Sequence, residues 1–201
     1  TQLPAAFPAG TTTYYAKWNA IYVPYYPPVP PTVKIEDDDA LGLNTTDHFA
    51  YIIGYGNGEV RPQNNITRAE VATIFFRLLT DDVRDENLTK TNRYSDVAAT
   101  SWYNTAVSTL SSMGIITGYP DGTFRPNAAI TRAEFTTLAV RFFDVYGDGN
   151  KVIMEQYKDF GDVSDGYWAA EYIKAAAKSG WINGYEDGSF RADRNISRAE
   201  V

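Results

Sequence analysis

A string of five residues occurs three times in this chain and constrains its fold more than any other feature. It reads Ile-Thr-Arg-Ala-Glu at residues 66–70 and 130–134, and Ile-Ser-Arg-Ala-Glu at residues 196–200. Each copy follows a second repeated string that opens with Gly-Tyr, at residues 54–62, 118–126 and 184–192. Because the two strings recur together at nearly constant spacing, the sequence predicts one structural unit repeated three times.

The pentapeptide has the features of a helix start. Thr67 and Glu70 have the spacing of a capping box, in which the hydroxyl and the carboxylate each accept a backbone N–H of the other residue. Ile66 precedes the cap and Val71 follows it at the spacing of a hydrophobic staple. An apolar stripe follows in the first two copies, at Val71, Ile74, Phe75, Leu78 and Leu79, and at Phe135, Leu138, Ala139, Phe142 and Phe143. This period predicts helices that are buried against one another.

A second helix is expected ahead of the Gly-Tyr string in two of the repeats. Apolar residues fall on one helical face before Gly114 and again before Gly180. These residues are Trp102, Ala106, Leu110 and Met113 in the second repeat, and Trp168, Tyr172 and Ala176 in the third. The first repeat has no matching stripe and no matching Trp. The repeat unit is therefore predicted to be a helix, a tight Gly-containing turn loop and a second helix.

The arginine of the pentapeptide is not explained by helix capping. A cation in the first turn faces the positive end of the helix dipole, which costs a few tenths to about 1 kcal/mol. Arg68, Arg132 and Arg198 all occupy this position, so something should offset the cost. One candidate is an anionic ligand at free helix N–H groups, and the other is an ion pair with a neighbouring repeat, such as an Asp of the turn loop. Sequence alone leaves both open.

Composition excludes several classes of function. The 201 residues include 18 Lys plus Arg and 25 Asp plus Glu, and the net charge of −7 argues against a nucleic-acid binder. There is no Cys and one His, His48, which leaves no basis for thiolate chemistry or a histidine-rich metal site. Asp148-Gly149-Asn150 lacks the ligand pattern of a calcium loop. No apolar run reaches the roughly 20 residues of a membrane span, so no membrane insertion is expected. No metal or cofactor is expected either, because the sequence shows no ligand pattern for one.

The N-terminal residues differ from the rest in composition. Residues 1–20 include the strand-like stretch 11–18, which resembles the closing strand of an internalin-type B-repeat and predicts the remnant of an upstream β-rich surface module. Residues 21–40 are rich in Pro and then acidic, which predicts a semi-rigid linker, with a ligand for a proline-binding domain as the alternative. We therefore expect the chain to be part of a longer protein.

The repeats resemble the S-layer homology (SLH) family. The resemblance rests on residues 118–126 and 130–135, with Tyr94-Ser95-Asp96-Val97, Trp102 and 114–116 ahead of them, and it extends over about residues 47–201. It implies a mainly α, pseudo-threefold domain with a central helix bundle and helix-loop prongs. This domain is expected at 41–201, with motif 1 at about 41–80, motif 2 at about 94–144 and motif 3 at about 158–201, the first and third being incomplete.

The resemblance also implies a function and a site. It implies a non-catalytic, extracellular module that anchors a secreted protein to the cell wall by binding an anionic, pyruvylated polysaccharide between adjacent motifs. The family's key arginine maps onto Arg68, Arg132 and Arg198. Motif 1 lacks its leading helix and motif 3 lacks its central helix, so Arg132, whose groove needs neither of them, is the safest candidate. Trp102 and Trp168 would stack on sugars or else be core residues, and Arg125 would be an auxiliary contact. The alternative function is a self-assembling module of a surface layer.

Overall fold

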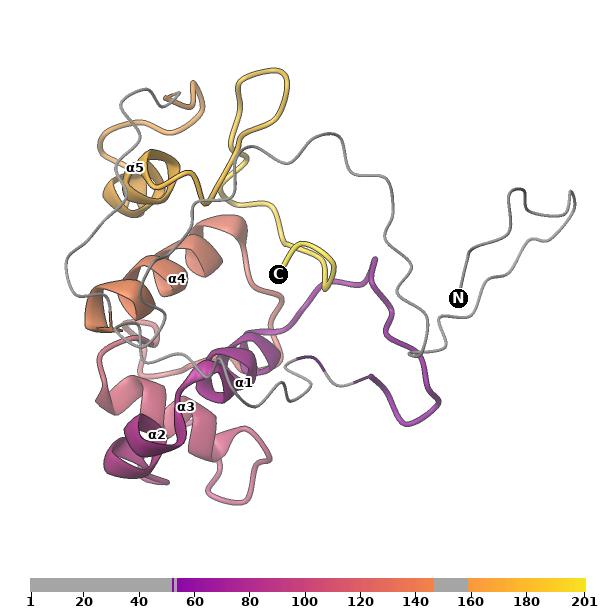
Figure 1. Cartoon of the computed structure of the whole chain (residues 1–201), viewed down its shortest axis with the longest axis vertical. Helices are drawn as coiled ribbons and strands as arrows, with labels where there is room; N and C mark the ends of the chain where they lie inside the picture. The colour runs from indigo at the N-terminus through magenta and orange to yellow at the C-terminus, as the bar shows by residue number, and fades with distance from the viewer. Residues whose placement is uncertain (1–51, 53, 147–158) are drawn as a thin grey trace, which may run out of the picture. The chain divides into compact units, whose positions relative to one another are not determined.

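The computed structural model describes residues 52, 54–146 and 159–201, which belong to a compact unit that spans Asp37–Val201. The expected tail (1–20), the linker (21–40), the start of motif 1 and Asp148 lie outside the described residues. The described residues form five helices and no strand (Figure 1), which confirms the mainly α fold. The helices are α1 (Arg68–Leu78), α2 (Asp81–Asn87), α3 (Asn104–Ser112), α4 (Arg132–Tyr146) and α5 (Ala170–Lys178).

The predicted capping boxes start the two central helices, α1 and α4. The Thr67 hydroxyl accepts from the Glu70 N–H at 3.2 Å, and the Thr67 N–H donates to the Glu70 carboxylate at 2.8 Å. Thr131 and Glu134 repeat both hydrogen bonds at 3.2 and 3.0 Å. In the third copy the Ser197 N–H donates to the Glu200 carboxylate at 2.8 Å. The local sequence therefore fixes where the central helices begin.

The isoleucines of the three pentapeptides bond to one another in a closed ring. The Ile66 N–H donates to the Ile196 carbonyl, the Ile130 N–H to the Ile66 carbonyl and the Ile196 N–H to the Ile130 carbonyl, each at 3.1 Å. All three side chains are buried. Each motif thus donates to one neighbour and accepts from the other, which gives the described domain its pseudo-threefold order.

The leading helix of each later motif packs on the central helix of the motif before it. Helix α3 packs on α1, and α5 packs on α4, as the adjacent ribbons in Figure 1 show. The larger apolar cluster joins motifs 1 and 2 and includes Ile196, while a smaller cluster joins Ala133 of motif 2 to motif 3 residues such as Ile173 and Phe190. Burial of these faces against the neighbouring motif supplies most of the helices' stability.

Two details differ from the sequence prediction. Helix α2 was not predicted, because its seven residues contain Val83 as the only large apolar side chain and show no helical stripe. Trp102 and Trp168 were placed on helical faces, but α3 and α5 begin two residues after them. Their side chains are 67% and 56% exposed, so the alternative that they are core residues is wrong. Among the described residues, no helix has the length and apolarity to cross a membrane.

Candidate functional site

Each pentapeptide arginine reaches the turn string of the next motif in cyclic order. We call these three contacts the 1–2, 2–3 and 3–1 junctions. In each, the arginine Nε donates to a backbone carbonyl of the turn string: Arg68 to Phe124 at 2.8 Å, Arg132 to Phe190 at 2.8 Å, and Arg198 to Val60 at 2.9 Å. The pentapeptide arginine, which helix capping does not explain, therefore joins two motifs.

The backbone N–H groups of the pentapeptide arginines are not free at any of the three junctions. The Arg68 N–H donates to the Ala128 carbonyl at 2.9 Å, and the Ala69 N–H to the Pro126 carbonyl at 3.0 Å. The N–H groups of Arg132 and Ala133, and of Arg198 and Ala199, donate to the next motif in the same way. The expectation that an anion would bind free N–H groups is wrong, because the neighbouring loop already satisfies them. A ligand must contact side chains instead.

Two of the three arginines form buried ion pairs across the junction. Arg68 lies 3.0 Å from the Glu134 carboxylate, and Arg198 lies 2.5 Å from that of Glu70. The two arginines are only 8% and 5% exposed. The ion pair with a neighbouring repeat that the sequence left open is therefore present at these two junctions. The partner of the arginine is the capping-box Glu of the next motif rather than a turn-loop Asp.

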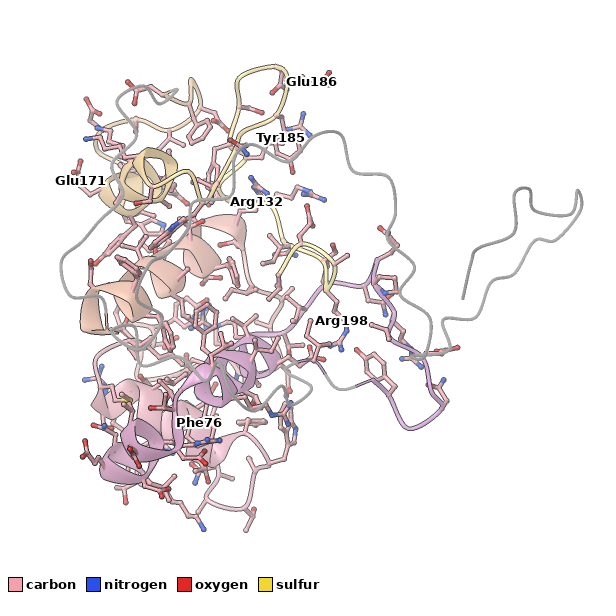
Figure 2. All side chains as sticks on the ribbon, in the orientation of Figure 1. Phe76, Arg132, Glu171, Tyr185, Glu186 and Arg198 are labelled. Carbon is pink, nitrogen blue, oxygen red and sulfur yellow. The ribbon has the colours of Figure 1, made fainter. Side chains whose placement is uncertain are left out.

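The 2–3 junction has a different set of partners. Arg132 forms no ion pair with any carboxylate of the described residues; its Nη2 donates to the Asn183 carbonyl at 3.4 Å. Its guanidinium carbon lies 5.1 Å from the Tyr185 ring centre and 4.6 Å from that of Phe190. Figure 2 shows Arg132 close to Tyr185. The equivalent glutamate, Glu200, binds Arg194 at 2.6 Å instead. Among the described residues, only backbone carbonyls and aromatic rings thus hold Arg132.

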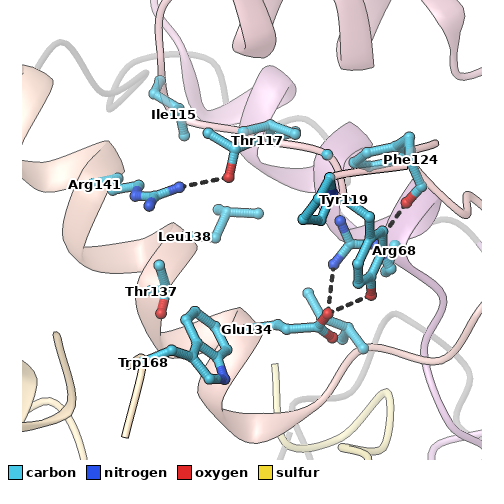
Figure 3. A pocket seen from close by; sticks show the side chains of 14 residues that line it. Arg68, Ile115, Thr117, Tyr119, Phe124, Glu134, Thr137, Leu138, Arg141 and Trp168 are labelled. Atoms are coloured by element: carbon cyan, nitrogen blue, oxygen red, sulfur yellow. Dashed lines mark hydrogen bonds and ion pairs between the residues drawn. The ribbon is translucent and has the colours of Figure 1, made fainter. Parts of the chain in front are cut away.

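A cavity of about 460 Å³ opens beside Arg68 at the 1–2 junction (Figure 3). Glu134 forms an ion pair with Arg68 and accepts a hydrogen bond from the Tyr119 hydroxyl at 2.5 Å. Burial and this hydrogen bond raise the pKa of Tyr119. Trp168 of motif 3 also lines the cavity, as does Thr137, whose buried hydroxyl has no hydrogen-bond partner among the described residues. The cavity therefore combines a guanidinium, a tyrosine and an exposed indole from three motifs.

A second cavity, of about 300 Å³, repeats this arrangement at the 3–1 junction. It is lined by Arg198, Glu70, Tyr55, Trp102 and Arg77, among others. The structure therefore brings Arg68 together with Trp168, and Arg198 together with Trp102. Neither cavity includes Arg132 or Arg125 in its lining.

Arg125 has a role in its own turn loop. It adopts a left-handed backbone with φ of 57°, as do Arg61 and Arg191 at the equivalent positions, with φ of 53° and 56°. The Asp96 carboxylate accepts the N–H groups of Phe124 and Arg125 at 2.8 and 2.7 Å. The Arg125 side chain pairs with Asp121 at 2.8 Å and lies 4.0 Å from the Tyr119 ring centre. These contacts offset the unfavourable backbone conformation and hold the turn in shape.

Acid should destabilise the domain over a defined range of pH. Hydrogen bonds from Thr123 and Arg125 lower the pKa of Asp121 to about 2, and bonds from Ser189 and Arg191 lower that of Asp187 further. At Glu200, burial opposes the shift, but bonds from Ser197 and Arg194 lower the pKa to about 2. A carboxylate with a depressed folded-state pKa contributes stability above its unfolded value and loses it as pH falls through the folded value.

We therefore expect the free energy of unfolding to fall between about pH 4.5 and about pH 2. Urea unfolding at several pH values measures it. The double variant Asp121→Asn/Asp187→Asn should flatten this dependence, whereas Glu86→Gln, at an exposed position on α2, should not. Stability that stays constant over this range in the unaltered chain would contradict the assignment of these hydrogen bonds.

Several junction residues were not identified from the sequence as site candidates. They are the tyrosines Tyr55, Tyr119 and Tyr185, the partners Glu70 and Glu134, and the cavity-lining Arg77 and Arg141. The repeats contained a signal for the tyrosines, since each follows the first Gly of its turn string. The glutamates had been assigned wholly to helix capping, yet Glu134 caps α4 with one oxygen and binds Arg68 with the other.

Comparison with known proteins agrees with this repeated architecture. The family model described as S-layer homology domain matches residues 50–72, 93–136 and 159–201, which is more than half of the chain. Cell surface glycoprotein 1 of Acetivibrio thermocellus is 40% identical over 170 residues, or 81% of the chain. The cellulosome-anchoring protein of the same organism is 37% identical over 84% of the chain. Amylopullulanase of Thermoanaerobacterium thermosulfurigenes is 34% identical over 81% of it.

The match covers only a part of each of these relatives. The chain spans 7% of the cell surface glycoprotein, 37% of the cellulosome-anchoring protein and 8% of the amylopullulanase. The three matched segments coincide with the three repeats that form the ring of isoleucines and the junctions. The chain therefore belongs to the S-layer homology family.

Proposed function

We propose that the chain is a non-catalytic anchoring module that holds its protein at the cell surface by binding an anionic wall polysaccharide at the motif junctions. The observation that carries the proposal is the shared lining of one cavity by Arg68, Tyr119 and the exposed Trp168. The 3–1 junction repeats the same three residue types with Arg198, Tyr55 and Trp102. A site built twice in one domain is a feature of a binding module.

The residue types fit an acidic sugar. A guanidinium is a planar donor that suits a carboxylate, and an exposed indole offers a flat apolar face on which a sugar ring can stack. A pyruvate ketal places a carboxylate directly on a sugar, so a pyruvylated glycan presents both features at once. We infer that Arg68, Arg132 and Arg198 receive the acid and that Trp102 and Trp168 contact the sugar faces.

The relatives support a location at the cell surface and a module separate from catalysis. Two of them are named as a cell surface glycoprotein and a cellulosome-anchoring protein. The third is named as an amylopullulanase, of which the matching region is 8%. In the described part of this chain, the glutamates of the pentapeptides are committed to helix caps and ion pairs rather than facing each other across a cleft.

Retention on purified cell walls tests the proposal. The chain should sediment with walls that retain their secondary polysaccharide and stay in solution with walls from which it has been extracted. Equal retention on extracted walls would overturn the proposal. Light scattering on the same sample measures self-association, so that assembly into a surface lattice is recognised as a separate cause of sedimentation.

Replacement of Arg132 tests the role of the arginines. Arg132→Ala should reduce wall binding about tenfold, because a guanidinium hydrogen-bonded to a carboxylate contributes roughly 1.5–3 kcal/mol. The fold should persist, since no carboxylate of the described residues is left unpaired by the change. Arg84→Ala on α2, which removes the same charge away from the junctions, is the control. Wall binding by Arg132→Ala equal to that of this control would count against the assignment.

A further inference from the structure

The 2–3 junction has a charged side chain at a position where the other two junctions have none. This position holds Asn64 in motif 1, Ala128 in motif 2 and Arg194 in motif 3. In each motif its backbone carbonyl accepts the N–H of the preceding motif's pentapeptide arginine, at 2.8, 2.9 and 2.9 Å. The three positions are therefore structurally equivalent, and only motif 3 places a charged side chain there.

Arg194 engages the carboxylate that would otherwise bind Arg132. Its Nη1 donates to Glu200 Oε1 at 2.6 Å and also to the Tyr185 hydroxyl. At the other junctions the equivalent glutamate oxygen binds the pentapeptide arginine itself: Glu134 Oε1 lies 3.0 Å from Arg68, and Glu70 Oε1 lies 2.5 Å from Arg198. The same glutamate oxygen is used each time, and at the 2–3 junction Arg194 occupies it in place of the pentapeptide arginine.

The result is an unequal pairing of the three pentapeptide arginines. At 1–2 and 3–1, the pentapeptide arginine pairs with the capping-box glutamate of the next motif. At 2–3, Glu200 pairs with Arg194, and Arg132 donates to the carbonyls of Phe190 and Asn183 instead. The two nearby aspartates contact other residues: Asp193 accepts from the Tyr167 hydroxyl at 2.7 Å, and Asp187 pairs with Arg191 at 2.9 Å. Among the described residues, Arg132 is therefore the one pentapeptide arginine that has no carboxylate partner.

We propose that Arg194 is the specificity-determining residue of the 2–3 junction. By holding Glu200, it leaves Arg132 available to an acidic group of the glycan, so this junction binds a carboxylate-bearing sugar more tightly than the 1–2 and 3–1 junctions. There, the ligand must first displace Glu134 or Glu70 from the arginine. The inference rests on the proposed function, which supplies the acidic ligand.

A measurement without ligand tests the hold of Arg194 on Glu200. In nitrogen-15 NMR of the full chain, the guanidinium groups of Arg68 and Arg198 should rotate slowly, because each is held by a carboxylate. Arg132 should rotate faster. In Arg194→Ala, Glu200 is released to Arg132, whose rotation should slow to the rate of Arg68. Arg132 rotation that is unchanged in this variant would overturn the proposal.

Titration with a small acidic sugar tests the consequence for binding. The probe is a methyl glucoside bearing a 4,6-linked pyruvate ketal, and its methyl ester is the neutral control. The Arg132 resonance should shift at the lowest probe concentration. Arg194→Ala should weaken this site about fivefold, the upper range for an exposed ion pair, and Arg194→Ala/Glu200→Gln should restore it. Arg84→Ala should leave the affinity unchanged.

The double variant separates two roles for Arg194. Restored affinity supports action through Glu200, whereas continued loss would mean that Arg194 itself binds the ligand and would overturn the proposal. If the probe shifts no arginine resonance in the unaltered chain, the proposed function fails. The measurement without ligand would then still decide whether Arg194 withholds Glu200 from Arg132.

Discussion

Gly118→Ala should destabilise the domain by about 3 kcal/mol or more, because the added methyl group has no room. A Cβ at this position would lie 2.3 Å from a ring carbon of Tyr94 and 2.5 Å from the Thr123 carbonyl oxygen. Tyr94 is buried and packs on Phe124, with ring centres 5.5 Å apart. The ring cannot move without disturbing the core, and the carbonyl is part of the turn that positions the contact to Arg68.

Thermal or urea unfolding measures this effect. A loss of that size corresponds to a lower melting temperature by roughly 6–12 °C for a domain of this length. Gly184→Ala should behave alike, since its Cβ would lie 2.5 Å from a Phe160 ring carbon and 2.7 Å from the Ser189 carbonyl oxygen. Gly56→Ala is the matched control, because no atom lies within 4 Å of its Cβ. Equal stability of Gly118→Ala and Gly56→Ala would show that the turn is packed differently.

Arg68→Ala should cost about 3–5 kcal/mol of folding stability, the range for breaking a buried ion pair by removing one partner. It leaves Glu134, whose side chain is 17% exposed, without its cation, and it leaves the Phe124 carbonyl without the Arg68 Nε–H. Arg132→Ala should cost less, because Arg132 has no carboxylate partner among the described residues. Urea unfolding of both variants provides the comparison.

A double variant separates ion pairing from lost packing. Arg68→Met/Glu134→Gln removes both charges, keeps most of the side-chain volume and retains a residue that can complete a capping box. It should recover most of the stability lost in Arg68→Ala, because a buried pair can often be replaced by uncharged groups at little cost. A double variant as unstable as Arg68→Ala would indicate that the packing of the guanidinium, rather than its charge, holds the junction together.

Features set by local sequence could be predicted without the structure. The capping boxes of Thr67 and Thr131 and the two leading helices follow from residue spacing alone. Repetition made these predictions secure, because the same hydrogen-bonding and apolar positions return in each copy. The mainly α fold and the family followed from the same repeats.

Features set by contacts between motifs could not be predicted from one repeat at a time. The ring of Ile66, Ile130 and Ile196 and the partner of each arginine depend on how the motifs meet. The sequence offered several acids to pair with Arg68, and only the structure shows that Glu134 is used. Arg194 was missed for the same reason, since its effect on Arg132 passes through Glu200 and appears only when the three junctions are compared.

The central claim is that the motif junctions recognise the acidic group of a wall polysaccharide. Isothermal titration calorimetry of the chain with purified wall polysaccharide, before and after mild acid removes its ketal-linked carboxylates, tests this claim most directly. We predict measurable binding to the intact polymer and at least a tenfold weaker affinity for the treated one. Equal affinity for the two polymers would contradict the claim, because the arginines would then not be binding the carboxylate.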